Sequence, residues 1–352
     1  MIVLESLWTL VKLIPLPAVV VCETLATADA PYNKHRTLRR IIGDAAARYM
    51  ANTFSIPQIR KLSGSTLDVY TNWAVKAKVP LVVDEIGGDA KLLWIGPRRL
   101  ERVILVVHGG GFMLPPMPAH LLFWDYVRVE LEKKGLTPGV VFLNYSLWPE
   151  ATFPTQLAQL CRAIKYLTAA GVQPSSIQLA GDSAGGNLIL QLFSHILHPH
   201  PAVDMLVLVE PLRAAYLISP WVGLSGETAS HDENDKIDYA RKESLIWIGS
   251  RIAGDVPEEY RAFAQASKAP EGWFTGVDAV VGDVLVTAGG SECLRDDVLI
   301  FGDMMKRVHP KTEVVVQPGG IHVDMFMDFW AGETKVGMLT PLILDRLLAG
   351  CA

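Results

Sequence analysis

One serine lies where the surrounding residues favour a nucleophile. Ser183 occupies the middle of GDSAGG (181–186), between a preceding apolar run and a following run of helix-forming residues. A strand, a sharp turn and a helix in direct succession would expose the serine hydroxyl at the helix N-terminus, where the dipole favours developing negative charge. Glycines suit this turn because side chains there would clash with neighbouring backbone. The stretch predicts a serine nucleophile rather than a glycine-rich turn that holds a serine by chance.

A second glycine-rich stretch could supply the hydrogen-bond donors that such a nucleophile needs. HGGGF (108–112) directly follows the apolar run RVILVV. Glycines let backbone N–H groups approach a developing oxyanion without interference from side chains. We expect the N–H groups of Gly109, Gly110 and Ala184, the residue after the serine, to form an oxyanion hole. His108 lies on the same side, so we expect it to fix this loop rather than to act as the base.

The two motifs together resemble the hormone-sensitive-lipase branch of the α/β-hydrolase fold. The resemblance covers residues 79–350 and implies that fold, the same three oxyanion donors, and a cap built from the N-terminus and an insertion after the sixth strand. One departure is visible, because the family often has Tyr-Arg-Leu-Ala-Pro-Glu where this chain has YSLWPE (145–150). This version is similar to that of fungal members from natural-product pathways.

The general base should follow the last strand, because the order along the chain in this fold is serine, acid, histidine. His322 lies in QPGGIHVDMF (317–326), directly after the apolar run TEVVVQPG. Among the nine histidines, only His322 follows a predicted strand in the right order. We predict that it is the base, and a loop histidine without a role is the alternative.

Three carboxylates compete for the role of the acid in AGGSECLRDD (288–297). Asp296 and Asp297 begin a predicted helix, where carboxylates in the first turn are explained by unpaired N–H groups and the helix dipole. Glu292 lies in the loop after the apolar run DVLVTAG. The resemblance agrees, because the family's Asp-Pro-Leu-Arg-Asp aligns with Glu-Cys-Leu-Arg-Asp here, with Glu in place of the commoner Asp. We predict Glu292 as the acid, with Asp296 in reserve.

These residues predict a serine hydrolase that cleaves a carboxylic ester of a small to medium apolar substrate through an acyl-enzyme. The sequence implies no metal and no cofactor. Two alternatives remain open. A substrate hydroxyl acting in place of water would give acyl transfer or macrolactonisation in natural-product biosynthesis with the same triad of Ser183, Glu292 and His322. A protein of this fold could also bind a small molecule without catalysis, although all three triad residues are present here.

The elements that must position these residues follow from the apolar pattern. VPLVVDEI and AKLLWIG, separated by GGD, predict a hairpin. Fully apolar strands then alternate with helices, which predicts a mostly parallel eight-stranded sheet with helices on both faces and a helical cap. The remaining strands are predicted at 102–110, 140–146, 176–183, 214–221, 283–289 and 312–319, with a helix at 153–171.

Two stretches lie outside this alternation and are expected to form the cap. Ligands of such folds bind at the carboxyl edge of the sheet, so a cap at that edge would cover the substrate. We predict Phe112 and Trp247 as substrate-binding residues. The predicted division is an N-terminal cap segment at 1–78, a cap insertion at 222–275 and a hydrolase core at 79–221 and 276–352.

The composition excludes several classes of protein. Half of the residues are hydrophobic and a fifth are charged, which is typical of a globular protein with a large core. The net charge of −5 without a basic run argues against nucleic acid as a partner. The four cysteines are scattered, which favours reduced thiols in the cytoplasm over disulfides or metal sites. The expected partner is a small-molecule ester or acyl substrate, and the oligomeric state stays open, with a dimer as one option.

The N-terminal stretch SLWTLVKLIPLPAVVVC (6–22) allows three interpretations. Its uninterrupted apolar part is short for a membrane span, and Pro15 and Pro17 should break a helix there. It could fold over the protein's own cleft, contact a membrane surface weakly, or belong to a signal peptide, against which Glu5 argues. We expect the first, with membrane association through this stretch as the alternative to a cytoplasmic protein.

Overall fold

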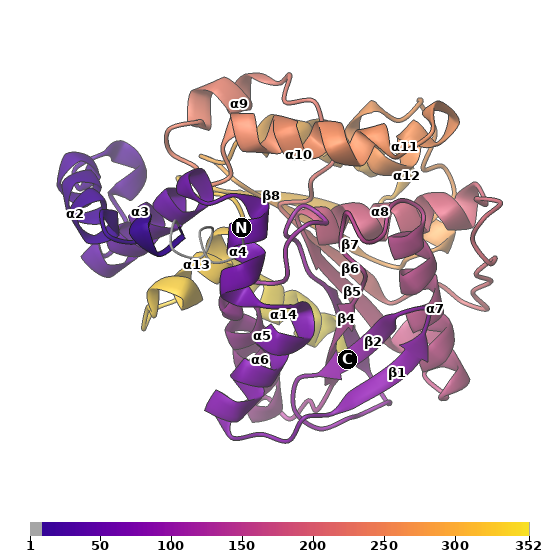
Figure 1. The fold of residues 1–352 in the computed structure, drawn as a ribbon. Coiled ribbons are helices and arrows are strands. Elements are labelled where there is room, and N and C mark those ends of the chain that lie inside the picture. Colours follow the sequence, from indigo (N-terminus) through magenta and orange to yellow (C-terminus); the bar gives the residue numbers. More distant parts are fainter. Residues whose placement is uncertain (1–8, 352) are drawn as a thin grey trace.

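An eight-stranded sheet forms the centre of the protein, which the computed structural model describes from residue 9 to residue 351 (Figure 1). The strands lie in the order β1-β2-β4-β3-β5-β6-β7-β8. The β1–β2 and β2–β4 pairs are antiparallel, and all other neighbours are parallel. The predicted α/β-hydrolase sheet is therefore confirmed. The bounds are β1 Val83–Gly87, β2 Ala90–Trp94, β3 Val103–Val107, β4 Gly139–Asn144, β5 Ile177–Asp182, β6 Ala214–Ile218, β7 Val284–Gly289 and β8 Thr312–Gln317.

Helices cover both faces of this sheet, and the strand side chains alternate between them. In β3, Leu105 packs into the core formed with α7, α8 and α12, whereas Ile104 and Val106 pack into the core formed with α6, α13 and α14. Because both faces are covered, apolar residues occupy successive positions, as the unbroken apolar runs predict. These helices are α6 Pro118–Lys133, α7 Thr155–Ala169, α8 Ala184–Leu197, α12 Arg295–Val308, α13 Asp324–Ala331 and α14 Leu339–Cys351.

The N-terminal segment and the insertion after β6 add further helices, and both segments reach the carboxyl ends of the strands. Asn234, at the end of α9, donates to the carbonyl of Glu292 in the loop after β7 (2.9 Å). Arg36, just before α3, donates to the carbonyl of Gly319 after β8 (2.8 Å). Both segments therefore contact the edge of the sheet at which the chemistry is predicted. Their helices are α2 Leu16–Thr27, α3 Leu38–Thr53, α4 Ile56–Ser63, α5 Thr66–Ala77, α9 Ala229–Asn234, α10 Lys242–Gly254 and α11 Arg261–Ala264.

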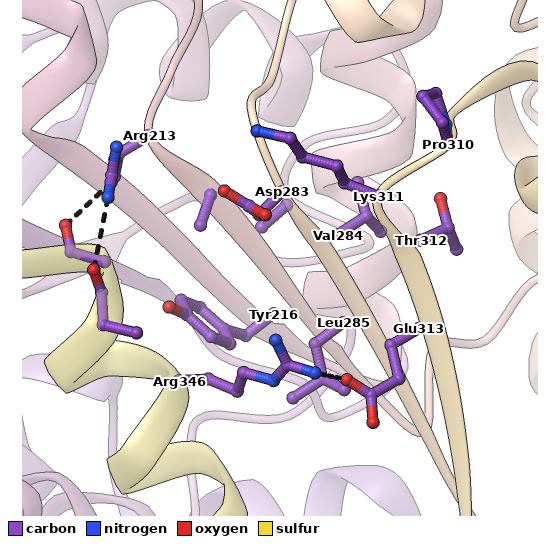
Figure 2. A pocket seen from close by; sticks show the side chains of 14 residues that line it. Arg213, Tyr216, Asp283, Val284, Leu285, Pro310, Lys311, Thr312, Glu313 and Arg346 are labelled. Atoms are coloured by element: carbon purple, nitrogen blue, oxygen red, sulfur yellow. Dashed lines mark hydrogen bonds and ion pairs between the residues drawn. The ribbon is translucent and has the colours of Figure 1, made fainter.

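A cavity of about 480 Å³ opens at the opposite end of the sheet (Figure 2). Arg213, Asp283 and Lys311 line it at the amino ends of β6, β7 and β8. In Figure 2, Arg346 of α14 reaches across the cavity to pair with Glu313. The motifs singled out from the sequence lie at the carboxyl ends of the strands, about a strand length of 20 Å away. This cavity is therefore separate from the predicted site.

Candidate active site

Ser183 lies in the tight turn between β5 and α8. Its backbone has φ +50° and ψ −118°, outside the regions that L-residues normally occupy. The turn is held because the Ser183 N–H donates to the carbonyl of Ile218 (3.0 Å) and its carbonyl accepts the N–H of Trp221 (2.9 Å). A Cβ at Gly185 would lie 1.9 Å from the carbonyl oxygen of Val107, so only glycine lets α8 begin here. The serine occupies the strained elbow that the sequence predicts.

The glycine-rich loop lies directly against this elbow. A Cβ at Gly109 would lie 3.0 Å from the Cβ of Ser183. However, the Gly109 N–H donates to the carboxylate of Asp182 (3.1 Å), so this N–H is already engaged, which differs from the role that we predicted for it. No hydrogen bond joins the N–H of Gly110 or of Ala184 to another residue in the described part of the chain. These two N–H groups are the predicted donors that stay available.

Two buried histidines hold this loop and the residue before the nucleophile. His120 of α6, which the sequence analysis missed, places its Nε2 3.0 Å from the Asp182 carboxylate, and its ring packs against Phe326. Burial lowers the pKa of His108 to about 4, so His108 is neutral. Its Nδ1 lies 2.7 Å from the Gly109 carbonyl and donates to it. His108 therefore has the loop-fixing contact expected of it.

His322 and Glu292 face each other from the loops after β8 and β7. The Nδ1 atom of His322 lies 3.5 Å from Oε2 of Glu292, and both side chains are buried. Within the described residues, neither this Nδ1 nor Glu292 Oε1 has a hydrogen-bond partner, so the two groups lie within ion-pair distance without a close hydrogen bond, and they form an ion pair when His322 is protonated. Burial lowers the pKa of His322, but the Glu292 carboxylate outweighs burial and raises the pKa above its ordinary value. The pair therefore favours a positive charge on the imidazole.

Ser219 orients the carboxylate of Glu292, although the sequence analysis did not single it out. Its hydroxyl donates to Glu292 Oε2 (2.6 Å) and accepts the N–H of Val323 (3.3 Å). The residue has φ +43° and directly follows β6. A hydroxyl residue at the carboxyl end of a predicted strand, in LISPW, is the signal that could have found it. Ser219 connects the acid to the residue that follows the histidine.

Asp238, in the insertion after β6, binds the main chain of the loops that hold Glu292 and His322. Its Oδ2 accepts the N–H of Cys293 (2.9 Å), and its Oδ1 accepts the N–H of His322 (3.2 Å). Burial raises the pKa of Asp238 to about 6, against the lowering effect of His322 and the backbone donors. The side chain lies between α9 and α10 and belongs to no recognisable motif. One buried carboxylate thus connects the loop of the acid to the loop of the base.

Asp296 and Asp297 lie in the first turn of α12, as predicted. They also fasten α12 to the neighbourhood of α9, which was not predicted. Asp296 accepts the N–H of Ser230 (2.9 Å), and Asp297 accepts the hydroxyl of Thr228 (3.1 Å). Of the three carboxylates in this stretch, Glu292 is the one beside the histidine.

The two predicted substrate-binding aromatics lie in different surroundings. Phe112 is buried, with its ring against Tyr145 at a centroid distance of 6.3 Å. Trp247 is 43% exposed and lines an open hollow on the outer side of α10. Its neighbour Ile248 faces inward, where a Cβ on Gly111 would lie 3.1 Å from Ile248 Cγ2. Ile248 is therefore the residue of α10 that reaches the glycine-rich loop.

The site is almost closed to solvent. Ser183 is 7% exposed and His322 is 4% exposed. Among residues 9–351, no group of three His, Cys, Asp or Glu side chains is arranged to hold a metal ion. A serine on a strained elbow, a histidine–carboxylate pair and unpaired backbone donors can together support nucleophilic attack on a carbonyl carbon.

Known proteins resemble this chain in sequence and in fold. Residues 104–326 match a family model described as alpha/beta hydrolase fold. The chain is 31% identical to an acetyl-hydrolase of Streptomyces hygroscopicus over 221 residues, which is 60% of this chain and 64% of that protein. It is also 31% identical to the hormone-sensitive lipase of Homo sapiens over 151 residues, 38% of this chain and 14% of that protein. The chain spans less than two thirds of either relative.

The crystal structure of an esterase from the bacterial hormone-sensitive lipase family superposes with a TM-score of 0.67. The match covers 89% of this chain and 97% of that chain at 21% identity. At this identity the likeness concerns the fold.

Proposed function

Because this chain belongs to the alpha/beta hydrolase fold family, in its hormone-sensitive-lipase-like branch, we propose that it is a serine esterase acting through Ser183, Glu292 and His322. One observation carries the proposal. Glu292 and His322 form a buried pair at the carboxyl ends of β7 and β8, at the same edge of the sheet where the elbow holds the serine. Esterase and lipase relatives make ester hydrolysis the reaction class.

The proposed reaction follows from the positions of these groups. His322 Nε2 removes the proton from the Ser183 hydroxyl as its oxygen attacks the ester carbonyl. Glu292 stabilises the imidazolium through Nδ1. The alcohol leaves with the proton from His322, and water activated by the same imidazole then hydrolyses the acyl-enzyme.

The oxyanion would bind to the N–H groups of Gly110 and Ala184. The N–H of Gly109 can join them only if it gives up its hydrogen bond to the Asp182 carboxylate and donates to the substrate oxygen instead. Two backbone N–H groups form the oxyanion hole of the serine proteases, and loss of a single donor of this kind typically costs about 10²–10³ in turnover.

The closed site favours a small to medium acyl group. Ile248 lies over the glycine-rich loop, and Phe112 of that loop is buried in the core, so little space is left for a long chain beside Ser183. One relative is an acetyl-hydrolase, which makes a short acyl ester the first substrate to test.

A second reaction uses the same residues with a different acceptor. Because Ser183 and His322 are both nearly excluded from water, a hydroxyl of the bound acyl chain could attack the acyl-enzyme instead of water, giving a lactone or a transferred acyl group. Mass spectrometry of the products from a hydroxy-acyl ester distinguishes the two reactions. The free hydroxy acid indicates hydrolysis, and a product lighter than this acid by the mass of one water indicates ring closure to a lactone.

Covalent labelling tests the proposed nucleophile. A fluorophosphonate probe should label the wild type and fail to label Ser183→Ala. The control variant Ser225→Ala changes a half-buried serine of the insertion after β6 that contacts Lys268, and it should be labelled normally. The same variants assayed with p-nitrophenyl acetate distinguish an enzyme from a small-molecule binder. Equal labelling of Ser183→Ala would assign the nucleophile to another residue.

The thiols support the expected reducing compartment. Cys22, Cys161 and Cys293 are all free, as is usual for a protein of the cytoplasm. We therefore propose that the catalytic body works in the cytoplasm.

A further inference from the structure

The apolar N-terminal stretch forms a helical segment from Thr9 to Thr27 that is long and apolar enough to cross a membrane. Residues 12–15 form a turn within it, and α2 begins just after Pro15, so the predicted break at the prolines is present. Residues 6–8 of the stretch lie outside the described residues. Only 17% of its most apolar part is buried, so this segment does not fold over the catalytic cleft as a buried lid.

The charged side chains of this segment face the protein. Lys12 donates to the carbonyl of Thr53 (2.7 Å) and to the side chain of Gln58 (2.9 Å). Glu23 pairs with Arg48 of α3. A helix on a water-soluble surface does the opposite, burying apolar side chains and exposing charged ones.

The outward side is correspondingly apolar, because every exposed residue from position 10 to position 26 is uncharged and apolar. Leu25 is 77% exposed and Ile14 is 75% exposed. The surface continues onto α3 through Leu38 and Ile42. We name this surface the N-terminal apolar face, and it comprises Leu10, Val11, Ile14, Val19, Val21, Leu25, Leu38 and Ile42.

The N-terminal apolar face lies apart from the catalytic body. In Figure 1, α2 and α3 form a pair that extends from one side of the molecule, beyond the sheet and beside α13. Arg40 of α3 fixes the pair to the body through ion pairs with Asp324 and Asp328, which lie on α13. These ion pairs hold α3, and α2 packed against it, on the helix that follows His322.

We propose that the N-terminal apolar face binds a lipid surface, with the α2–α3 pair lying in the interface between the acyl chains and the headgroups. Its large exposed side chains are all aliphatic, whereas protein interfaces depend on aromatic and arginine anchors. One side of the pair is covered by protein and holds paired charges, so it lies in the membrane plane instead of spanning it. Exposed Lys34 and Arg39 flank Leu38, where cations would meet the headgroups.

Vesicle flotation of the full chain tests this proposal. The wild type should float with phosphatidylcholine vesicles, because the attraction is apolar and needs no anionic lipid. The double variant Ile14→Asp/Leu25→Asp should lose about tenfold or more of the bound fraction, since each change puts a charge among acyl chains. The matched control is Val75→Asp/Val209→Asp, whose positions are 70% and 85% exposed on other surfaces, and it should float like the wild type.

Three results would overturn the proposal. The wild type could stay with the soluble fraction, the double variant could float as well as the wild type, or the control could lose binding equally. A dimer seen by analytical ultracentrifugation without lipid, and abolished by Ile14→Asp/Leu25→Asp, would instead assign the face to a second copy of the chain. Turnover of water-soluble p-nitrophenyl acetate should be the same in all variants, so failure of this proposal and failure of the proposed esterase function are distinguishable.

Discussion

The Oδ1 atom of Asp238 accepts the backbone N–H of His322 at 3.2 Å. The other oxygen of the same carboxylate accepts the N–H of Cys293 at 2.9 Å, the residue directly after Glu292. A side chain of the insertion after β6 thus connects the loop of the acid to the loop of the base. The insertion is therefore part of what positions the proposed triad.

Asp238→Asn should lower turnover by about ten- to a hundredfold while changing KM little. The amide nitrogen cannot accept a hydrogen bond, so one of the two loops loses its anchor, and misplacement of a catalytic group by about 1 Å costs roughly this much. The measurement is steady-state kinetics with p-nitrophenyl acetate across pH. Asp235→Asn is the matched control, since the hydrogen bonds of Asp235 in the described part of the chain go to Arg241 and Lys242 of the same insertion. Unchanged turnover and an unchanged pH profile in Asp238→Asn would rule out this positioning role.

Glu292→Gln should lower turnover by an order of 10⁴, as the equivalent exchange does in a serine protease. The amide preserves the shape of the side chain but cannot stabilise the imidazolium. Asp296→Asn should keep turnover within a few-fold of the wild type. A nearly inactive Asp296→Asn beside an active Glu292→Gln would move the acid to position 296.

Asp297→Asn should cost more stability than the helix dipole alone accounts for. A first-turn carboxylate contributes about 0.3–1 kcal/mol through the dipole. Asp297 is also buried and accepts the hydroxyl of Thr228, and disturbing a buried hydrogen-bonded group costs about 1–3 kcal/mol. Chemical denaturation of both aspartate variants measures this difference. If Asp296→Asn and Asp297→Asn lose equal and small amounts of unfolding free energy, the contact with Thr228 contributes little.

The acid limb of the kcat/KM profile should have its midpoint above pH 6.5. Neutral His322 is the active base, and Glu292 raises the pKa of His322 above its ordinary value of 6.5 despite burial. The ion pair stabilises the fold fully below pH 6.5, and this contribution is lost as the pH rises through the raised pKa. As the pH rises through this pKa, activity should therefore increase while the contribution of the ion pair to the free energy of unfolding decreases. In Glu292→Gln the residual activity should show a lower midpoint, and a wild-type midpoint below 6.5 would contradict the pairing.

Arg40→Met should destabilise the protein by about 3–5 kcal/mol, because it removes the cation that pairs with the buried Asp328 and leaves Arg36 alone to balance the other two carboxylates of the cluster. Arg40 pairs with Asp44, Asp324 and Asp328, and all four side chains are buried. Arg39→Met is the control, since Arg39 is exposed and donates to the carbonyl of Gly332. Urea unfolding followed by circular dichroism gives both values, and similar midpoints for the two variants would contradict the importance of the cluster.

The sheet and the elbow could be predicted from the sequence because their signals are local. An apolar run, a glycine-flanked serine and a helix-forming run occur within a few residues around Ser183, and each imposes its own backbone geometry. The hairpin of β1 and β2 has the same local character, with GGD between two strands. The order of the motifs along the chain then indicates which loops meet at the carboxyl edge.

The supporting contacts could not be predicted because they depend on packing between distant segments. Asp238 is 84 residues from His322, and no motif surrounds it. The Gly109 N–H is directed to Asp182 by the approach of two loops. Trp247 and Ile248 are neighbours on α10, and their side chains point about 100° apart around the helix axis. Which of the two faces the glycine-rich loop depends on how α10 packs against the sheet.

The ion pairs between the N-terminal segment and α13 set a limit for anyone who wishes to crystallise a shortened, more soluble form of this protein. A truncation that removes the exposed apolar residues of α2 should begin after Thr27. It should also begin before Arg36, so that the ion pairs with α13 are kept. Arg36 binds Asp324 and the carbonyl of Gly319, and Arg40 follows in the same cluster. A start beyond Arg40 would leave the carboxylates of Asp324 and Asp328 buried without a cation. Because Asp324 is two residues from His322, we expect the loop that holds His322 to become disordered in such a truncated protein.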